Sequence, residues 1–191
     1  MLAEPIRILL RVSWILENLE IPYLTGGSVA SSIFGIPRAT QDIDLVIDLP
    51  LAKVKDLVKA MQPEFYIDSD AVTQAVHRRS SFNAIHFETA QKIDFFIRGQ
   101  DDYARQEMRR RLAVAVDEAV NRTIFVASPE DIILQKLVWY RMGSRISERQ
   151  WNDVLGVIKV QGDHLDRDYL TRWAKELAVS DLVEEALRNA R

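Results

Sequence analysis

Apolar side chains recur at two different periods along the chain, and the pattern changes near residue 128. Before that point, segments with helical spacing alternate with segments in which every second residue is apolar. Recurrence at three and four residues predicts an amphipathic helix, whereas strict alternation predicts a strand with one buried face. The first part therefore predicts an α/β fold of the α+β kind, a mixed β-sheet flanked by helices. After Ser128 only the helical period remains.

The elements expected in the first part follow from these periods. Helices are expected over 5–20, 29–34, 51–61 and 71–76, and strands over 21–24, 42–49, 82–87, 92–97, 112–116 and 123–126. The short segment 88–91 between two strands predicts a hairpin.

The helical part begins at a clear signal, Ser128-Pro129-Glu130-Asp131. Proline suits the first helical position, and acidic side chains favour a helix N-terminus. Helices are expected over 129–142, 147–160, 166–178 and 180–190. We therefore expect two domains, an α/β module over 1–127 and a helical C-terminal portion over 128–191 that packs on a cleft of the module.

Composition narrows the class of protein. The chain has 191 residues, 28% of them charged, and it contains no cysteine, which excludes disulfides and thiolate metal sites. Apolar runs stay well short of the roughly 20 residues that a membrane-spanning helix needs, so a cytoplasmic protein with no membrane partner is expected. The formal charge of -3 gives no general attraction to nucleic acid. The basic runs His77–Arg79 and Arg109–Arg111 are interpreted as solvated surface.

Two carboxylates lie on one face of an expected strand. Asp42 and Asp44 flank Ile43, and side chains two residues apart in a strand point the same way. Neighbouring ionised carboxylates repel each other unless a cation neutralises them. Hard divalent ions such as Mg²⁺ prefer oxygen ligands of this kind.

A third acid lies on another expected strand. Ile93, Phe95 and Ile97 alternate on one face, which places Asp94 on the opposite face. If the two strands are neighbours, the three carboxylates converge. Two of them can then bridge two ions, Mg²⁺ or Mn²⁺, and Asp94 can accept a proton from an attacking hydroxyl.

Gly26-Gly27-Ser28 precedes an expected helix. Glycines allow a close approach of the backbone, and Ser28 can cap the helix beginning at Val29. Backbone N–H groups at a helix N-terminus attract anions, so this segment predicts a phosphate cradle.

Basic side chains elsewhere are candidates for the same phosphates. Lys136 stands within an apolar stripe, with Ile132 and Ile133 before it and Trp139 after it. Its ammonium either reaches solvent at the rim of the core or contacts a triphosphate, and the stripe alone favours neither. Arg38, in the loop before the acidic strand, is a weaker candidate. His86 is expected to share a face with Ala84 and to point to solvent.

The residues Gly27, Ser28, Asp42, Asp44 and Asp94 resemble, one by one, the motif of the nucleotidyltransferase superfamily typified by polymerase beta. The segments 26–30 and 38–44 resemble the small bacterial branch that includes the AbiEii-type toxins. The resemblance is strong over about 22–97 and weaker elsewhere.

Two C-terminal motifs extend the resemblance. Ile132 to Lys136 matches the Ile-x-x-x-Lys motif of the toxin-type members, which favours a nucleotide contact for Lys136. Their Arg-Asp-x-x-Asp motif corresponds to 149–153, so the resemblance adds Asp153 to the nucleotide-binding residues. Gln150 replaces the first Asp of that motif, and the chain is shorter than the full toxins. Both departures concern toxin activity and leave the acidic triad intact.

The resemblance implies a nucleotidyltransferase with its catalytic module over 1–127. It implies transfer of a nucleoside monophosphate from a triphosphate to an acceptor hydroxyl, with release of pyrophosphate and two bound Mg²⁺ or Mn²⁺ ions. An RNA end, a protein hydroxyl and a small molecule all remain open as acceptors. The alternative is a non-catalytic nucleotide-binding or regulatory module, such as one component of a toxin–antitoxin pair with an antitoxin protein as partner.

Overall fold

The computed structural model describes residues 4–40, 42–117 and 122–190. They form two compact units, which are described separately. The first unit contains residues up to Gly26 and those from Thr40 to Val126, and the second contains Gly27–Ala39 and the residues after Val126. Across these described ranges, no helix is long and apolar enough to cross a membrane.

The first unit is built on a mixed sheet with the strand order β3-β4-β5-β2-β1-β7-β6. Its strands are β1 (Tyr23–Thr25), β2 (Asp42–Ile47), β3 (Phe65–Tyr66), β4 (Ser81–His86), β5 (Lys92–Ile97), β6 (Leu112–Asp117) and β7 (Arg122–Val126). β2 and β5 are parallel central neighbours, whereas β4 is antiparallel to β5 and β1 is antiparallel to β2.

The central strands have one apolar face and one polar face. In β2 and β5 every second residue is buried, including Ile43, Leu45, Ile93 and Phe95, and these side chains form the core. Phe82 of β4 stacks on Phe95 with ring centroids 4.8 Å apart. The alternate residues of the same strands, Asp44 among them, therefore lie together on the opposite face.

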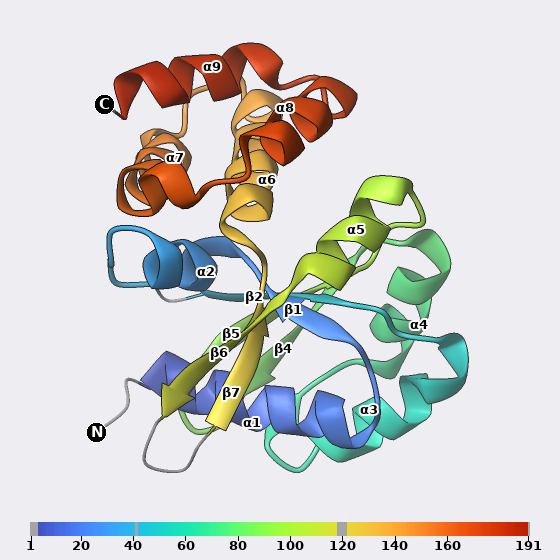
Figure 1. Ribbon diagram of the computed structural model, residues 1–191. Helices are drawn as coiled ribbons and strands as arrows, with labels where there is room; N and C mark the ends of the chain where they lie inside the picture. The colour runs from blue at the N-terminus through green and yellow to red at the C-terminus, as the bar shows by residue number, and fades with distance from the viewer. Residues whose placement is uncertain (1–3, 41, 118–121, 191) are drawn as a thin grey trace. The chain divides into compact units, whose positions relative to one another are not determined.

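Helices cover the apolar face (Figure 1). They are α1 (Glu4–Asn18), the 3₁₀ turn η1 (Leu51–Lys53), α3 (Val54–Met61) and α4 (Ser69–Arg78), and the unit also contains α5 (Asp102–Arg110). α1 packs on α3, β2 and β7, and α4 packs on α3 and β4. Leu9, Val12 and Leu16, at helical spacing in α1, have no exposed surface, so burial of this stripe holds α1 on the sheet.

The second unit is helical. It consists of α2 (Gly27–Phe34), α6 (Pro129–Met142), α7 (Glu148–Gln161), the turn η2 (Gly162–His164), α8 (Arg167–Glu176) and α9 (Ser180–Asn189). α6 begins as its sequence indicates, with Pro129 in the first turn and the Ser128 hydroxyl accepting a hydrogen bond from the Asp131 N–H. α2 packs against both α6 and α7.

Two glycines set the spacing between α2 and α7. A Cβ at Gly35 would lie 2.8 Å from the Val157 nitrogen, and one at Gly156 would lie 3.2 Å from the Ile36 nitrogen. No side chain other than hydrogen fits at Gly35 without movement of the backbone. This contact fixes the segment that leads to Arg38.

The structure confirms the predicted fold class, a mixed sheet with flanking helices and a helical C-terminal part. β3 and α5 were not predicted from the sequence. The prediction for His86 was half wrong. It shares a face with Ala84, but that face is the buried one, where the ring lies 5.1 Å from Phe65 and Nδ1 lies 3.0 Å from the Thr89 hydroxyl.

Candidate active site

The three acidic residues lie on adjacent strands of the first unit. In the parallel ladder of β2 and β5, Asp44 is directly opposite Asp94, and Asp42 is opposite Lys92. All four side chains belong to the polar face of the sheet, because the residues between them are buried. The sheet register therefore brings together the carboxylates that the sequence separates by about fifty positions.

A lysine accompanies these carboxylates. Lys92 Nζ lies 2.7 Å from Asp94 Oδ2, within hydrogen-bonding and ion-pairing distance. The hydrogen bond to Asp94 raises the pKa of Lys92, and the charges of Asp42 and Asp44 add to this. The ammonium therefore lies in the field of all three carboxylates.

The donor set suits a hard divalent cation. It offers carboxylate oxygens from two neighbouring strands, the ligand type that Mg²⁺ prefers. Within residues 4–40, 42–117 and 122–190, no three His, Cys, Asp or Glu side chains form a group arranged to hold a metal ion. Asp94 instead contacts an ammonium. The three carboxylates therefore suit a divalent cation because of their oxygen ligands and because they lie on the same face of the sheet. In this structure the cationic partner of Asp94 is Lys92.

The glycine segment is positioned by a backbone hydrogen bond within the first unit. The Gly26 N–H donates to the Asp44 carbonyl oxygen at 2.9 Å, which attaches the end of β1 to the acidic strand. Gly27 has a φ of 56°, the left-handed region that favours glycine. Gly26 therefore attaches the end of β1 to β2 through its backbone N–H. Gly27 makes the turn that follows, with a φ that residues carrying a Cβ rarely adopt.

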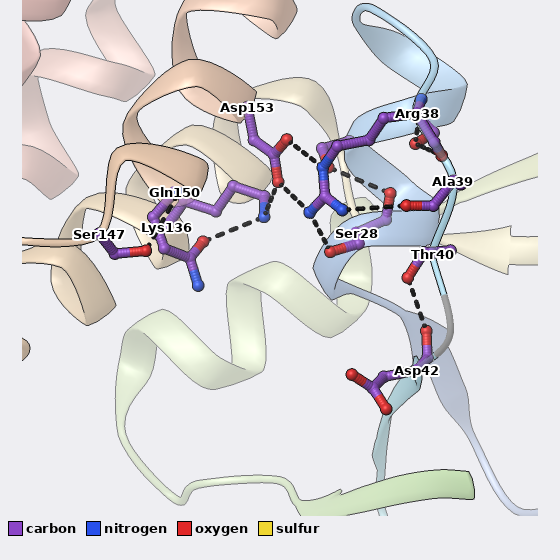
Figure 2. A network of polar contacts seen from close by, with 11 residues as sticks. Ser28, Arg38, Ala39, Thr40, Asp42, Lys136, Ser147, Gln150 and Asp153 are labelled. Atoms are coloured by element: carbon purple, nitrogen blue, oxygen red, sulfur yellow. Dashed lines mark hydrogen bonds and ion pairs between the residues drawn. The ribbon is translucent and has the colours of Figure 1, made fainter.

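Ser28 differs from its expected role as a cap before Val29. α2 already begins at Gly27, and the Ser28 hydroxyl accepts a hydrogen bond from Arg38 Nη2. Ser28 therefore belongs to a polar cluster of the second unit, shown in Figure 2.

Asp153 is the centre of that cluster. Its carboxylate accepts hydrogen bonds from Arg38 Nε at 2.7 Å and Nη2 at 2.8 Å, a bidentate pair, and from Lys136 Nζ at 2.8 Å (Figure 2). Lys136 also donates to Gln150 Oε1 at 3.1 Å. One carboxylate thus fixes two cationic side chains from different segments of the chain.

Two members of the cluster are largely removed from solvent, whereas the Arg38 side chain is 29% exposed. The Lys136 and Asp153 side chains are each 6% exposed, so the Lys136 ammonium does not reach solvent at the rim of the core. Burial raises the pKa of Asp153, but the hydrogen bonds from Arg38 and Lys136 outweigh it and hold the pKa below its usual value. The pKa of Arg38 is raised by the same pairing with Asp153. The cluster of Arg38, Lys136 and Asp153 therefore carries two positive charges against one negative charge.

Some of these relations were not predictable from the residue pattern. Arg38 and Asp153 are 115 positions apart, and no local period indicates that they pair. The sequence marks Gln150 only as a departure from a motif, whereas the structure shows it as a direct hydrogen-bond partner of Lys136. Lys92 did carry a signal, since it lies two residues before Asp94 on the same strand face.

Solved structures with the same fold are nucleotidyltransferase proteins. An antigenic nucleotidyltransferase-like protein from Paracoccidioides brasiliensis aligns with a TM-score of 0.57 at 17% identity, over 95% of this chain and 91% of that one. The antibiotic-resistance factor ANT(2'')-Ia aligns with a TM-score of 0.58 at 14% identity, over 96% and 99%. The lincosamide antibiotic adenylyltransferase LnuA, solved with lincomycin, gives 0.51 at 13%, over 83% and 98%. At these identities the likeness establishes the fold, which is that of the nucleotidyltransferases.

The family is established by sequence. The model of the nucleotidyl transferase AbiEii toxin family, of type IV toxin–antitoxin systems, matches residues 7–189. The chain belongs to this family and is a nucleotidyltransferase that uses a nucleoside triphosphate, as the resemblance of its motifs implied. Comparison with curated proteins gave no match.

Proposed function

We propose that the chain transfers a nucleoside monophosphate to an acceptor hydroxyl in a reaction that depends on divalent metal ions, and that Asp42, Asp44 and Asp94 hold those ions. The observation that carries the proposal is the register of β2 and β5, with Asp44 opposite Asp94 on the polar face of the sheet. Mg²⁺ or Mn²⁺ held there would stabilise negative charge on the reacting phosphate. Lys92 supplies only one positive charge to these three carboxylates, so the face keeps a net negative charge that a divalent ion would offset, which argues against a purely non-catalytic module.

The protein's own carboxylates divide the remaining work. Asp42 and Asp44 would hold the ion that neutralises the reacting phosphate, and would in this way help to orient that phosphate. Asp94 accepts the proton of the attacking acceptor hydroxyl, which then displaces pyrophosphate from the α-phosphate. Positioning and charge stabilisation supply most of the rate in phosphoryl transfer, so rigid strands are suitable supports for these groups.

The second unit, taken by itself, offers groups suited to the oxygens of a triphosphate. Gly27 and Ser28 offer backbone N–H groups at the beginning of α2, and Gly26 leads the chain into this turn. Arg38 and Lys136 supply positive charge for the phosphate oxygens. Asp153 is acidic and takes an indirect part, because it holds both cations in place through the hydrogen bonds described above.

The acceptor decides the biological role. Two of the proteins with this fold are named as an antibiotic-resistance factor and as a lincosamide antibiotic adenylyltransferase, whereas the family description is that of a toxin of type IV toxin–antitoxin systems. An RNA end, a protein hydroxyl and a small molecule each present the hydroxyl that this chemistry needs.

A labelling experiment tests the proposal. The protein is incubated with each α-labelled nucleoside triphosphate and Mg²⁺, together with total RNA, a protein extract or a small-molecule extract as separate acceptors. We expect label in one acceptor fraction, dependent on the metal and reduced at least a hundredfold by Asp44→Asn, as for the loss of a major charge-stabilising group. Transfer of equal rate without metal, or in Asp44→Asn, would contradict the assignment.

A further inference from the structure

Lys92 lies on the acidic face, and nucleotidyl transfer as proposed above gives it no role. It lies in β5, opposite Asp42 and two residues before Asp94, on the same side of the sheet as both. Its ammonium is 2.7 Å from Asp94 Oδ2. A side chain so placed in the cluster needs its own explanation.

The charge balance supplies one. Asp42, Asp44 and Asp94 repel one another on adjacent strands, and nearby opposite charge relieves this repulsion. Lys92 provides one positive charge close to these carboxylates, since its ammonium pairs with Asp94 of β5. An ammonium is a compact point charge on a flexible stem, so it can occupy the place of a cation and also leave it.

The exposure of the two partners agrees with a removable contact. The Lys92 side chain is 45% exposed and that of Asp94 is 22% exposed. The Lys92 side chain can therefore turn toward solvent, where its ammonium is well hydrated, without disturbing the packing of the core. By contrast, the Lys136–Asp153 pair is enclosed, with 6% exposure for each side chain.

We infer that Lys92 is an internal counter-ion of the acidic triad, which occupies Asp94 in the metal-free protein and must leave it before a divalent ion can bind there. This inference rests on the proposed function of the triad. Lys92 then acts as a positioning residue that sets the affinity for metal. It stabilises the metal-free protein, and it lowers the affinity for an ion that arrives without a nucleotide.

The inference predicts opposite effects of one substitution on stability and on metal affinity. Lys92→Met keeps the stem and removes the charge, so the metal-free variant should melt at a lower temperature than the wild type. Its Kd for Mn²⁺ alone should fall by about tenfold or more, since an ion no longer displaces a charge-assisted hydrogen bond. Lys92→Gln should behave in the same way and provides a second neutral variant. Lys92→Arg should bind Mn²⁺ as weakly as the wild type.

The test is a Mn²⁺ titration of these variants by calorimetry without nucleotide, with melting curves of each metal-free protein. Lys59→Met is the matched control, because it removes an equal charge from an exposed position of α3 in the same unit. Its Kd should stay within about twofold of wild type, as expected for a surface charge beyond close contact. Wild-type affinity in both neutral variants, or an equal gain in Lys59→Met, would overturn the role of Lys92. Neither of these results would affect the proposed transfer reaction.

Two further outcomes separate the inference from the proposed function. Tighter Mn²⁺ binding by Lys92→Met, without label transfer by any of the proteins, would support the counter-ion and contradict the transfer reaction. No Mn²⁺ binding by any of them, even at millimolar concentration, would overturn both.

Discussion

Two cationic side chains share the buried carboxylate of Asp153, so loss of this carboxylate should lower the free energy of unfolding. Removing the acid leaves the buried Lys136 ammonium and the partly exposed Arg38 guanidinium without the carboxylate that they share. Breaking a buried pair from one side typically costs about 3–5 kcal/mol. We therefore expect Asp153→Asn to lower the free energy of unfolding by this amount at pH 7, as measured by urea denaturation.

The same substitution has a defined pH dependence. Because the pKa of Asp153 is lower in the folded protein than its ordinary value of 3.8, the pairing stabilises the fold above that value and is lost as pH falls through the folded-state pKa. The difference in unfolding free energy between wild type and Asp153→Asn should therefore be constant from pH 7 to about 5 and shrink below about pH 4. A difference that stays constant down to pH 2 would show that the carboxylate does not contribute as an ion.

Lys136 offers a separate test of the nucleotide contact. Lys136→Met preserves the buried stem, and Asp153 keeps its bidentate contact with Arg38. We expect a loss of stability of about 1–3 kcal/mol, the range for a charged hydrogen bond, and at least a tenfold rise in the Kd for nucleoside triphosphate. Gln161→Met is a suitable control, because its side chain bonds the Phe34 carbonyl in the same unit and no nucleotide role is proposed for it. Normal nucleotide binding by a folded Lys136→Met protein would make Lys136 purely structural.

At the scale of elements, the strands and the helices differ in how far they could be predicted. β2 and β5 were predictable because strict alternation leaves only one face for Asp44 and Asp94. α5 was missed because its sequence is dominated by charge, although Asp101 at its N-cap, whose side chain accepts from the Ala104 N–H, was a usable signal. β3 has only two residues and depends on pairing with β4, which no local pattern specifies.

The turn between β1 and α2 gives a prediction at this scale. Gly27 adopts a positive φ, so Gly27→Ala should cost about 1 kcal/mol through backbone strain, and a β-branched residue there should cost more. Gly26 has an ordinary φ and open space around its Cα, so Gly26→Ala should be nearly neutral. Chemical denaturation of the two alanine variants checks the contrast. Equal stabilities would show that the turn relaxes at little cost.

The contact between α2 and α7 gives another prediction. Gly35→Ala places a methyl group 2.8 Å from backbone atoms of Ser31 and Val157, so the helices must separate. We expect destabilisation of about 1–3 kcal/mol, the usual range for overpacking, and weaker nucleotide binding through displacement of Arg38. Gly143→Ala is the matched control, since its nearest neighbour would be a carbonyl oxygen at 3.3 Å. Wild-type stability in Gly35→Ala would show that the close approach is not required.

At the scale of the whole molecule, the chain distributes its chemistry between two compact units. Alternation within a strand predicted which residues share a face, and the family resemblance predicted the class of enzyme, which the match over residues 7–189 confirms. The pairing of Arg38 with Asp153 could not be predicted, because it depends on tertiary packing between segments far apart in sequence. The assignment of the carboxylates to metal ions stays a prediction.

The central claim is that the acidic face of the sheet binds the metal ions of nucleotidyl transfer. The most direct measurement is the shift of melting temperature with Mg²⁺ in wild type, in the double variant Asp42→Asn, Asp44→Asn, and in Asp48→Asn as a control from the same unit. Asp48 lies one position beyond β2 and pairs with Arg98 at 2.9 Å. A ligand at a hundred times its Kd stabilises the folded state by about 2.7 kcal/mol, so wild type and Asp48→Asn should melt several degrees higher with Mg²⁺, and the double variant should not respond. An equal rise in the double variant would contradict the account.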